Sequence, residues 1–222
     1  MRIKLKYIIL LLFFSGSCFP QSGLPVFFHF VYDSHALVTG TSYHNEAHRT
    51  TISVARLYVS QFCFFNKGQK VAAVNNSCFL LDVEKPQYLS RTLAIPDGLV
   101  FDEVRFLIGI DEKTNDAGIG NGDLDPAKDM YWAWQSGYIN MKLEGKTDGT
   151  EFTYHIGGFL SPYLSAREVL LPVTHNDSLS ICIDVKKLLD GTDVNLTPHI
   201  MSPGPKAMTM SDRAPKMFSI CR

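Results

Sequence analysis

The sequence has little excess of either charge. It contains 21 basic and 22 acidic residues among 222, which gives a formal net charge of −1. Because nucleic-acid-binding domains usually have a strongly basic face, this balance argues against a nucleic-acid partner. With 45% hydrophobic residues the chain is too apolar to be disordered. Since no later apolar run reaches the roughly 20 residues of a transmembrane helix, membrane contact is expected only through an attached lipid.

The motifs of several enzyme classes are also missing. There is no GxSxG serine motif, and the glycines at Gly118, Gly120 and Gly122 lack the strand-and-helix context of a phosphate-binding loop. Carboxylates within one loop do not by themselves make the acid and base of a glycosidase. We therefore expect no enzymatic activity, with a hydrolase as the minor alternative.

The N-terminus has the pattern of a secretory signal peptide. Arg2, Lys4 and Lys6 precede the apolar run 7–14, and small residues follow at 15–17. This pattern predicts a signal peptide over residues 1–21 and an exported protein, either periplasmic or lipid-anchored at a bacterial cell envelope. Cys18 is the candidate lipidation site. The alternative is ordinary cleavage near residues 18–21, in which Cys18 is discarded with the signal peptide.

Cysteines are few, and their spacing contains no CxxC pair. Without Cys18 the mature chain has four cysteines, an even number that indicates disulfides in an exported protein. Four cysteines allow three pairings. Proximity in the sequence favours Cys63 with Cys78 across a hairpin, and Cys182 with Cys221 between the last two strands. A zinc or redox site is not expected from this spacing.

Short segments rich in aromatic and β-branched residues predict strands. They lie at 26–32, 50–65, 78–83, 100–110, 138–143, 152–156, 169–173 and 179–185. Such short strands between turn signals are typical of an all-β, antiparallel, immunoglobulin-like β-sandwich, here one domain over residues 22–222. A hairpin is expected around 145–149, and one or two short helices at 186–190 and 204–213.

A long acidic loop, residues 111–129, interrupts this pattern. Long loops of this kind often carry function. Asp111, Asp123 and Asp125 are candidate calcium ligands, because Ca²⁺ prefers carboxylate and carbonyl oxygens. The loop does not match the EF-hand spacing. The alternative is a solvated turn in which Asp125 accepts hydrogen bonds from the backbone.

Histidine and methionine supply candidate metal ligands. His29 lies in the apolar segment FFHFVY, so we expect it to be partly buried, and His155 lies in EFTYHIGG before two glycines. A buried neutral imidazole requires a hydrogen bond or a metal. Thioethers favour Cu(I), although methionine is also an ordinary core residue. Four methionines lie near the C-terminus: Met201, Met208, Met210 and Met217.

Both tryptophans, Trp132 and Trp134, stand in GDLDPAKDMYWAWQSGY, and FTYHIGG follows. Together with VRFLIGID and IMSPGPKAM, these segments resemble the MbnP-like copper-binding protein family from about residue 27 to residue 220. The most specific part is LDP-x(4)-MYWAW-x(2)-GY followed by YHIGG. The resemblance implies an exported protein of bacterial copper handling.

In characterised members of that family, Cu(I) is held by histidines and by a tryptophan that a partner dihaem peroxidase-like enzyme oxidises to kynurenine. The matching positions here are His155, His29, Trp132 and Trp134. The resemblance thus implies a copper-binding protein with this metal site. The alternative is an exported non-metal or calcium-dependent binding or cell-surface module, in which the tryptophans anchor the core.

Overall fold

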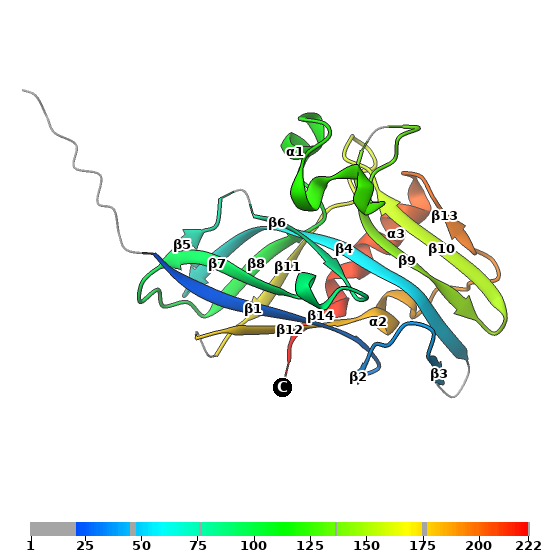
Figure 1. Ribbon diagram of the computed structural model, residues 1–222, viewed down its shortest axis with the longest axis horizontal. Coiled ribbons are helices and arrows are strands. Elements are labelled where there is room, and N and C mark those ends of the chain that lie inside the picture. The colour runs from blue at the N-terminus through cyan, green and yellow to red at the C-terminus, as the bar shows by residue number, and fades with distance from the viewer. Residues whose placement is uncertain (1–20, 45–47, 76, 136, 175–176, 222) are drawn as a thin grey trace, which may run out of the picture.

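The computed structural model of the chain describes residues 21–44, 48–75, 77–135, 137–174 and 177–221, and it consists mainly of two curved β-sheets (Figure 1). The predicted signal peptide, up to residue 20, and Cys18 lie outside the described residues. Within the described part of the chain, no helix is both long and apolar enough to cross a membrane.

The first sheet has five strands, in the order β14-β12-β1-β2, with β7 also paired to β1. Its strands are β1 (Gln21–Tyr32), β2 (His35–Ala36), β7 (Ser90–Pro96), β12 (Leu179–Asp184) and β14 (Phe218–Ile220). The pair β1 and β12 is parallel, whereas the other pairs are antiparallel. Strands from the two ends of the described part of the chain therefore share this sheet, with β12 between β1 and β14.

The second sheet has nine strands, in the order β11-β8-β4-β9-β10-β13, with β3, β5 and β6 also paired to β4. Its strands are β3 (Ser42–His44), β4 (Arg49–Asn66), β5 (Gln69–Ala73), β6 (Cys78–Asp82), β8 (Glu103–Ile108), β9 (Ile139–Thr147), β10 (Thr150–Gly157), β11 (Arg167–Pro172) and β13 (His199–Ile200). The pair β10 and β13 is parallel. The expected hairpin is confirmed, since β9 and β10 are antiparallel neighbours.

The prediction of a mostly β structure is confirmed. The prediction that the strands are all antiparallel is wrong, and the immunoglobulin-like topology is not confirmed. Both sheets are mixed, because each contains one parallel pair. The alternation of apolar and polar residues shows that a segment is a strand and which residues share a face. It does not show the direction of the neighbouring strand, which depends on connections between distant parts of the chain.

Helices are short. They are α1 (Glu112–Asp116), α2 (Val185–Leu189) and α3 (Pro205–Arg213), with single 3-10 turns η1 (Pro86–Tyr88), η2 (Gly122–Leu124), η3 (Pro126–Lys128) and η4 (Ala214–Met217). The helices α2 and α3 occur where the sequence predicts them. The helix α1 lies within the acidic loop and was not expected. Figure 1 shows this loop projecting from the second sheet.

The main hydrophobic core lies between the two sheets. Alternate residues of β1 (Leu24, Val26, Phe28 and Phe30) and of β10 (Phe152, Tyr154 and Ile156) are buried in it. The residues between them therefore point away from the core, on the outer face of each sheet. This alternation determines where the candidate histidines lie.

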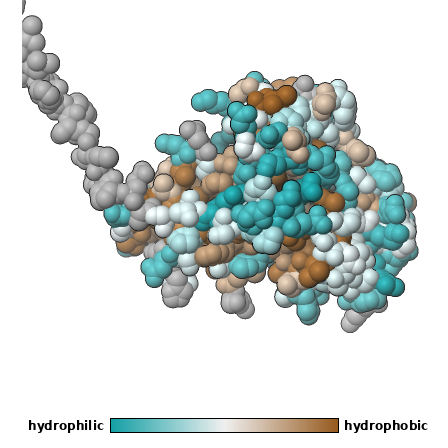
Figure 2. Space-filling model, viewed as in Figure 1, coloured by the Kyte–Doolittle hydropathy of each residue, from teal (hydrophilic) through white to brown (hydrophobic). Residues whose placement is uncertain are grey.

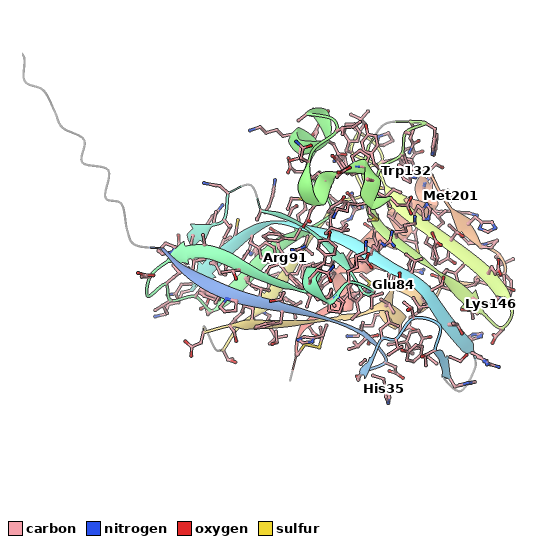
Figure 3. The ribbon with its side chains drawn as sticks, viewed as in Figure 1. His35, Glu84, Arg91, Trp132, Lys146 and Met201 are labelled. Carbon is pink, nitrogen blue, oxygen red and sulfur yellow. A yellow bond between two sulfur atoms is a disulfide. The ribbon has the colours of Figure 1, made fainter. Side chains whose placement is uncertain are left out.

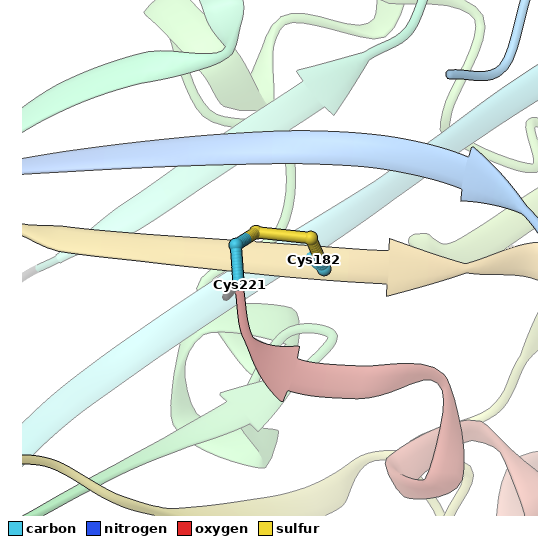
Figure 4. The surroundings of a disulfide bond; sticks show 2 residues. All are labelled: Cys182 and Cys221. Carbon is cyan, nitrogen blue, oxygen red and sulfur yellow. A yellow bond between two sulfur atoms is a disulfide. The ribbon is translucent and has the colours of Figure 1, made fainter. Parts of the chain in front are cut away.

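One of the two predicted disulfides is present. Cys182 and Cys221 form a disulfide between β12 and the residue after β14 (Figure 4). The predicted Cys63–Cys78 disulfide is wrong, because both residues are free. Cys78 pairs with Ser60 of β4, three residues before Cys63, and the strand register shifts between them. Three strand residues span roughly 10 Å, whereas bridged cysteines have Cα atoms within about 7 Å.

Alkylation tests the burial of the free Cys78 thiol. Burial raises the pKa of the Cys78 thiol to about 12, and nearby carboxylates act in the same direction. Because the thiolate is the reactive form, we expect native Cys78 in a Cys63→Ser variant to react with iodoacetamide about a thousand-fold more slowly at pH 7 than an ordinary cysteine. The rate should rise with pH up to the pKa, and denaturant should abolish the protection. Rapid labelling of the native variant at pH 7 contradicts the burial of Cys78.

Candidate functional site

The two tryptophans lie in a turn rather than at the start of a strand. Tyr131 and Tyr138 form an isolated bridge, and the backbone N–H of Trp132 donates to the Gly137 carbonyl at 2.9 Å. We call residues 131–135 the tryptophan turn. Trp132 is 5% exposed and Trp134 is 67% exposed. The two rings therefore differ in burial, although their centroids are only 5.9 Å apart.

Trp132 packs against the outer side of the second sheet. It belongs to a small apolar cluster, separate from the main core, that contains Tyr58, Leu80, Ile110, Met130, Tyr138 and Ile139. Its ring lies over Gly157 at the end of β10, where a Cβ atom would come within 2.6 Å of Trp132 Cζ3. The indole Nε1 is buried and has no hydrogen-bond partner among the described residues. Trp132 is therefore a packing anchor whose polar atom is unsatisfied.

A largely apolar cavity of about 260 Å³ adjoins Trp132. Its walls come from the tryptophan turn, the segment after β10 and the segment after β13, and they include Trp132, Gln135, Phe159, Leu160, Tyr163 and Pro203. Leu160 is itself exposed, as is the neighbouring Trp134. Exposed apolar side chains beside a cavity form a surface suited to contact with an apolar group.

His155 lies at the outer face of β10, close to this region. Its strand neighbours Tyr154 and Ile156 face the main core, so the imidazole points to the opposite side. His155 is opposite Lys142 of β9, and only 8% of its surface is exposed. Its Nε2 lies 2.7 Å from Oε1 of Glu144, within hydrogen-bond distance. The sequence prediction thus selected a nearly buried, hydrogen-bonded imidazole.

His29 lies elsewhere. It stands between Phe28 and Phe30 of β1, both of which face the core, so His29 points outward from the first sheet and is exposed. The expectation that it is partly buried is wrong. Because the core separates the two sheets, His29 and His155 lie on opposite outer faces. One metal ion cannot contact both histidines of a single chain.

Met201, rather than His29, occupies the position next to His155, because it directly follows the adjacent strand β13. The parallel strands β10 and β13 pair Thr153 with His199 and Tyr154 with Ile200, so His155 and Met201 occupy the next positions. Ile200 is in the core, which places Met201 on the outer side, where it is 49% exposed. In the sequence Met201 was only one of four C-terminal methionines, because nothing there shows the parallel pairing.

Trp132 and Met201 appear at the same end of the molecule (Figure 3). The contacts agree with that view, because Trp132 and Pro203 line one cavity and Pro203 lies within 3.1 Å of the Cβ position of Gly158. The end of β10 therefore has the tryptophan turn on one side and the segment 201–203 on the other.

The predicted calcium ligands do not converge. Asp111 accepts from the Thr114 N–H at the start of α1, and Asp125 accepts from the Ala127 N–H at the start of η3. Asp123 accepts from the Leu80 N–H at 3.0 Å and from Arg91 at 2.9 Å. In the part of the chain that the structure describes, no group of three or more His, Cys, Asp or Glu residues could hold a metal ion. These carboxylates stabilise the loop, as the solvated-turn alternative expected for Asp125.

An ionic row crosses the outer face of the second sheet. His155, Lys142, Arg56 and Asp82 are paired in register on the neighbouring strands β10, β9, β4 and β6. Asp129, at the end of the acidic loop, forms an ion pair with Lys142 and lies 3.7 Å from Nη1 of Arg56. Figure 2 shows hydrophilic residues gathered near the middle of the visible side of the molecule. The acidic loop is thus bound to the sheet by charge, beside the apolar contact of Trp132.

These features define a class of β-rich protein with two mixed sheets and a tryptophan turn at the end of one strand. The MbnP family model matches residues 21–202, and the chain belongs to this family. Among solved structures, MbnP from Methylosinus trichosporium is similar, with a TM-score of 0.59 and 15% identity, over 83% of this chain and 82% of that chain. At this identity the likeness shows the fold alone. None of the curated proteins matches the chain.

Proposed function

We propose that this protein is an exported copper-binding protein that holds Cu(I) at the end of β10, with His155 as the principal ligand. The observation that carries the proposal is the nearly buried imidazole of His155, in an MbnP-family chain, with a methionine position beside it. Imidazole and thioether are suitable ligands for the soft Cu(I) ion. A protected, largely apolar surrounding tunes such a site. The role proposed is binding rather than catalysis.

The tryptophan turn supplies the second part of the proposal. An unmodified indole offers only an N–H donor, so it can cover a cation with its ring but is a poor ligand. Oxidation to kynurenine cleaves the C2–C3 bond of the indole, and C2 then leaves as formate. The product carries an aryl ketone and a free aromatic amine, and the amine can bind copper. A partner dihaem peroxidase-like enzyme would supply the oxidising equivalents. Trp134 is the accessible ring, whereas Trp132 lies against β10.

Mass spectrometry of the protein from its native host tests the modification. We expect a mass increase that peptide fragmentation assigns to the tryptophan turn, and the same spectrum reports signal-peptide cleavage and any lipid on Cys18. Unmodified tryptophans contradict the kynurenine part of the proposal. They leave a histidine- and thioether-based copper site to be tested directly by metal binding.

Cu(I) affinity tests the copper proposal. Chain 21–222 is titrated anaerobically in competition with a chromogenic Cu(I) chelator. We expect His155→Ala to weaken binding by at least about 100-fold, equivalent to roughly 2.7 kcal/mol. Met201→Leu should weaken it less, because the thioether is half exposed.

His29→Ala is the matched control, because His29 is exposed on the other sheet and its loss should leave the affinity unchanged. Circular dichroism checks that each variant remains folded. If His155→Ala binds Cu(I) as tightly as the unaltered protein, the proposal fails.

A second candidate function is an exported non-metal binding module. The exposed rings and side chains of Trp134 and Leu160 beside the 260 Å³ cavity favour it, because a largely apolar surface of this kind can receive a ligand or a partner. Absence of Cu(I) binding together with unmodified tryptophans supports this function. Tight Cu(I) binding that depends on His155 supports the first.

A further inference from the structure

We infer that Glu144 is a positioning residue for His155 and that it directs the copper ion to Nδ1 of the imidazole rather than Nε2. The inference rests on the proposed Cu(I) site and adds to it the ligand atom and the residue that selects this atom.

The first step is the hydrogen bond between the two side chains. Nε2 of His155 lies 2.7 Å from Oε1 of Glu144, whereas Nδ1 has no hydrogen-bond partner among the described residues. An ionised carboxylate only accepts hydrogen bonds, so Nε2 must carry the proton. In the neutral ring the lone pair is then on Nδ1, and a metal binds through that lone pair.

The second step is the support of Glu144 itself. Lys142, which pairs with His155 across the strands, has its Nζ 3.7 Å from Oε1 of Glu144. The Lys142 side chain is only 7% exposed, so the three charged or polar groups meet where little water competes. Asp129 of the acidic loop binds the same ammonium group. The chain of contacts from Asp129 through Lys142 to Glu144 therefore links the loop that precedes the tryptophan turn to the imidazole.

The third step is the chemistry of metal-binding histidines. Such residues usually donate their second ring N–H to a carboxylate, which fixes the ring and makes the other nitrogen more basic. His155 and Glu144 already have this arrangement. The ammonium group of Lys142, next to Glu144, also repels a cation from the Nε2 side. Both effects leave Nδ1 as the nitrogen for Cu(I).

Nitrogen-15 NMR of the folded chain 21–222 reads the tautomer of His155 directly. We expect the proton on Nε2 both without metal and with Cu(I), and a Cu(I)-induced shift at Nδ1. Cu(I) bound at Nε2, or a proton on Nδ1 in the metal-free protein, overturns the inference. This measurement needs no variant, so it decides the question even if a substitution of Glu144 prevents folding.

Substitutions measure the effect of the carboxylate. We expect Glu144→Ala to lower Cu(I) affinity 10–100-fold, the usual effect of losing such a partner, and to leave the tautomer unfixed. Glu144→Gln should restore part of both, because its amide oxygen still accepts from Nε2. Glu151→Gln is the control, since Glu151 is an exposed acid of the same hairpin.

The two proposals fail separately. If His155→Ala abolishes tight binding but Glu144→Ala does not weaken it, the role of Glu144 is disproved and the copper site stands. If neither His155→Ala nor Glu144→Ala changes the affinity, the copper site itself is disproved. The tautomer of the metal-free protein then still reports whether Glu144 fixes the ring.

Discussion

Replacing Trp132 by alanine should lower the free energy of unfolding by about 3–5 kcal/mol, the range for removing a large aromatic side chain from a packed site. The same replacement at Trp134 should change it by less than about 0.5 kcal/mol, as expected for an exposed side chain. The two residues are one position apart, but Trp132 is 5% exposed and fills the apolar cluster on the second sheet, whereas Trp134 is 67% exposed.

Denaturation by urea, followed by circular dichroism, measures both values. Trp132→Phe serves as an intermediate variant, because it retains an apolar ring without the unsatisfied indole N–H. Equal effects of the two alanine variants would falsify the assignment of Trp132 as the packing anchor. Trp134→Ala, if stable as expected, also allows the contribution of this exposed ring to Cu(I) binding to be measured without loss of the fold.

The strands could be predicted because they depend on local sequence. The alternation in β1 and β10 follows from the burial of every second residue, and the hairpin between β9 and β10 follows from the Asp148–Gly149 turn. The parallel pairs could not be predicted in this way. They join β1 to β12 and β10 to β13, and each pair is separated by a long stretch of chain.

The candidate site shows the same distinction between local and distant information. Alternation correctly places His155 on the outer face of its strand, but it does not show that His29 belongs to the other sheet. Met201 becomes a neighbour of His155 only through the parallel pairing of β10 and β13. Glu144 could have been found from the hairpin, because Glu144 and His155 are close across two antiparallel strands whose turn the sequence indicates.

The carboxylates of the acidic loop have two kinds of partner, and only one kind is local in the sequence. Asp111 and Asp125 bind backbone N–H groups two or three residues ahead, a local arrangement that the sequence could indicate. Asp123 and Asp129 bind Arg91, Lys142 and Arg56, which come from three other strands. A cluster of acids in sequence therefore becomes a set of separate anchors. Their common effect is to hold the segment before the tryptophan turn against the second sheet.

Loss of the Cys182–Cys221 disulfide should destabilise the protein by about 4 kcal/mol. A cross-link limits the freedom of the unfolded chain, and this value is the chain-entropy estimate for a closed loop of the observed length, 39 residues. The bond also holds β14, which has only three residues, at the edge of the first sheet.

A Cys182→Ser/Cys221→Ser variant compared with the unaltered protein by urea denaturation measures the effect, and a reductant should reproduce it in the unaltered protein alone. Cys63→Ser is the matched control, because Cys63 is free and its substitution leaves the cross-link intact. Equal stability with and without reductant contradicts the prediction. Destabilisation by reductant that persists in the double serine variant also contradicts it, because Cys63 and Cys78 are free.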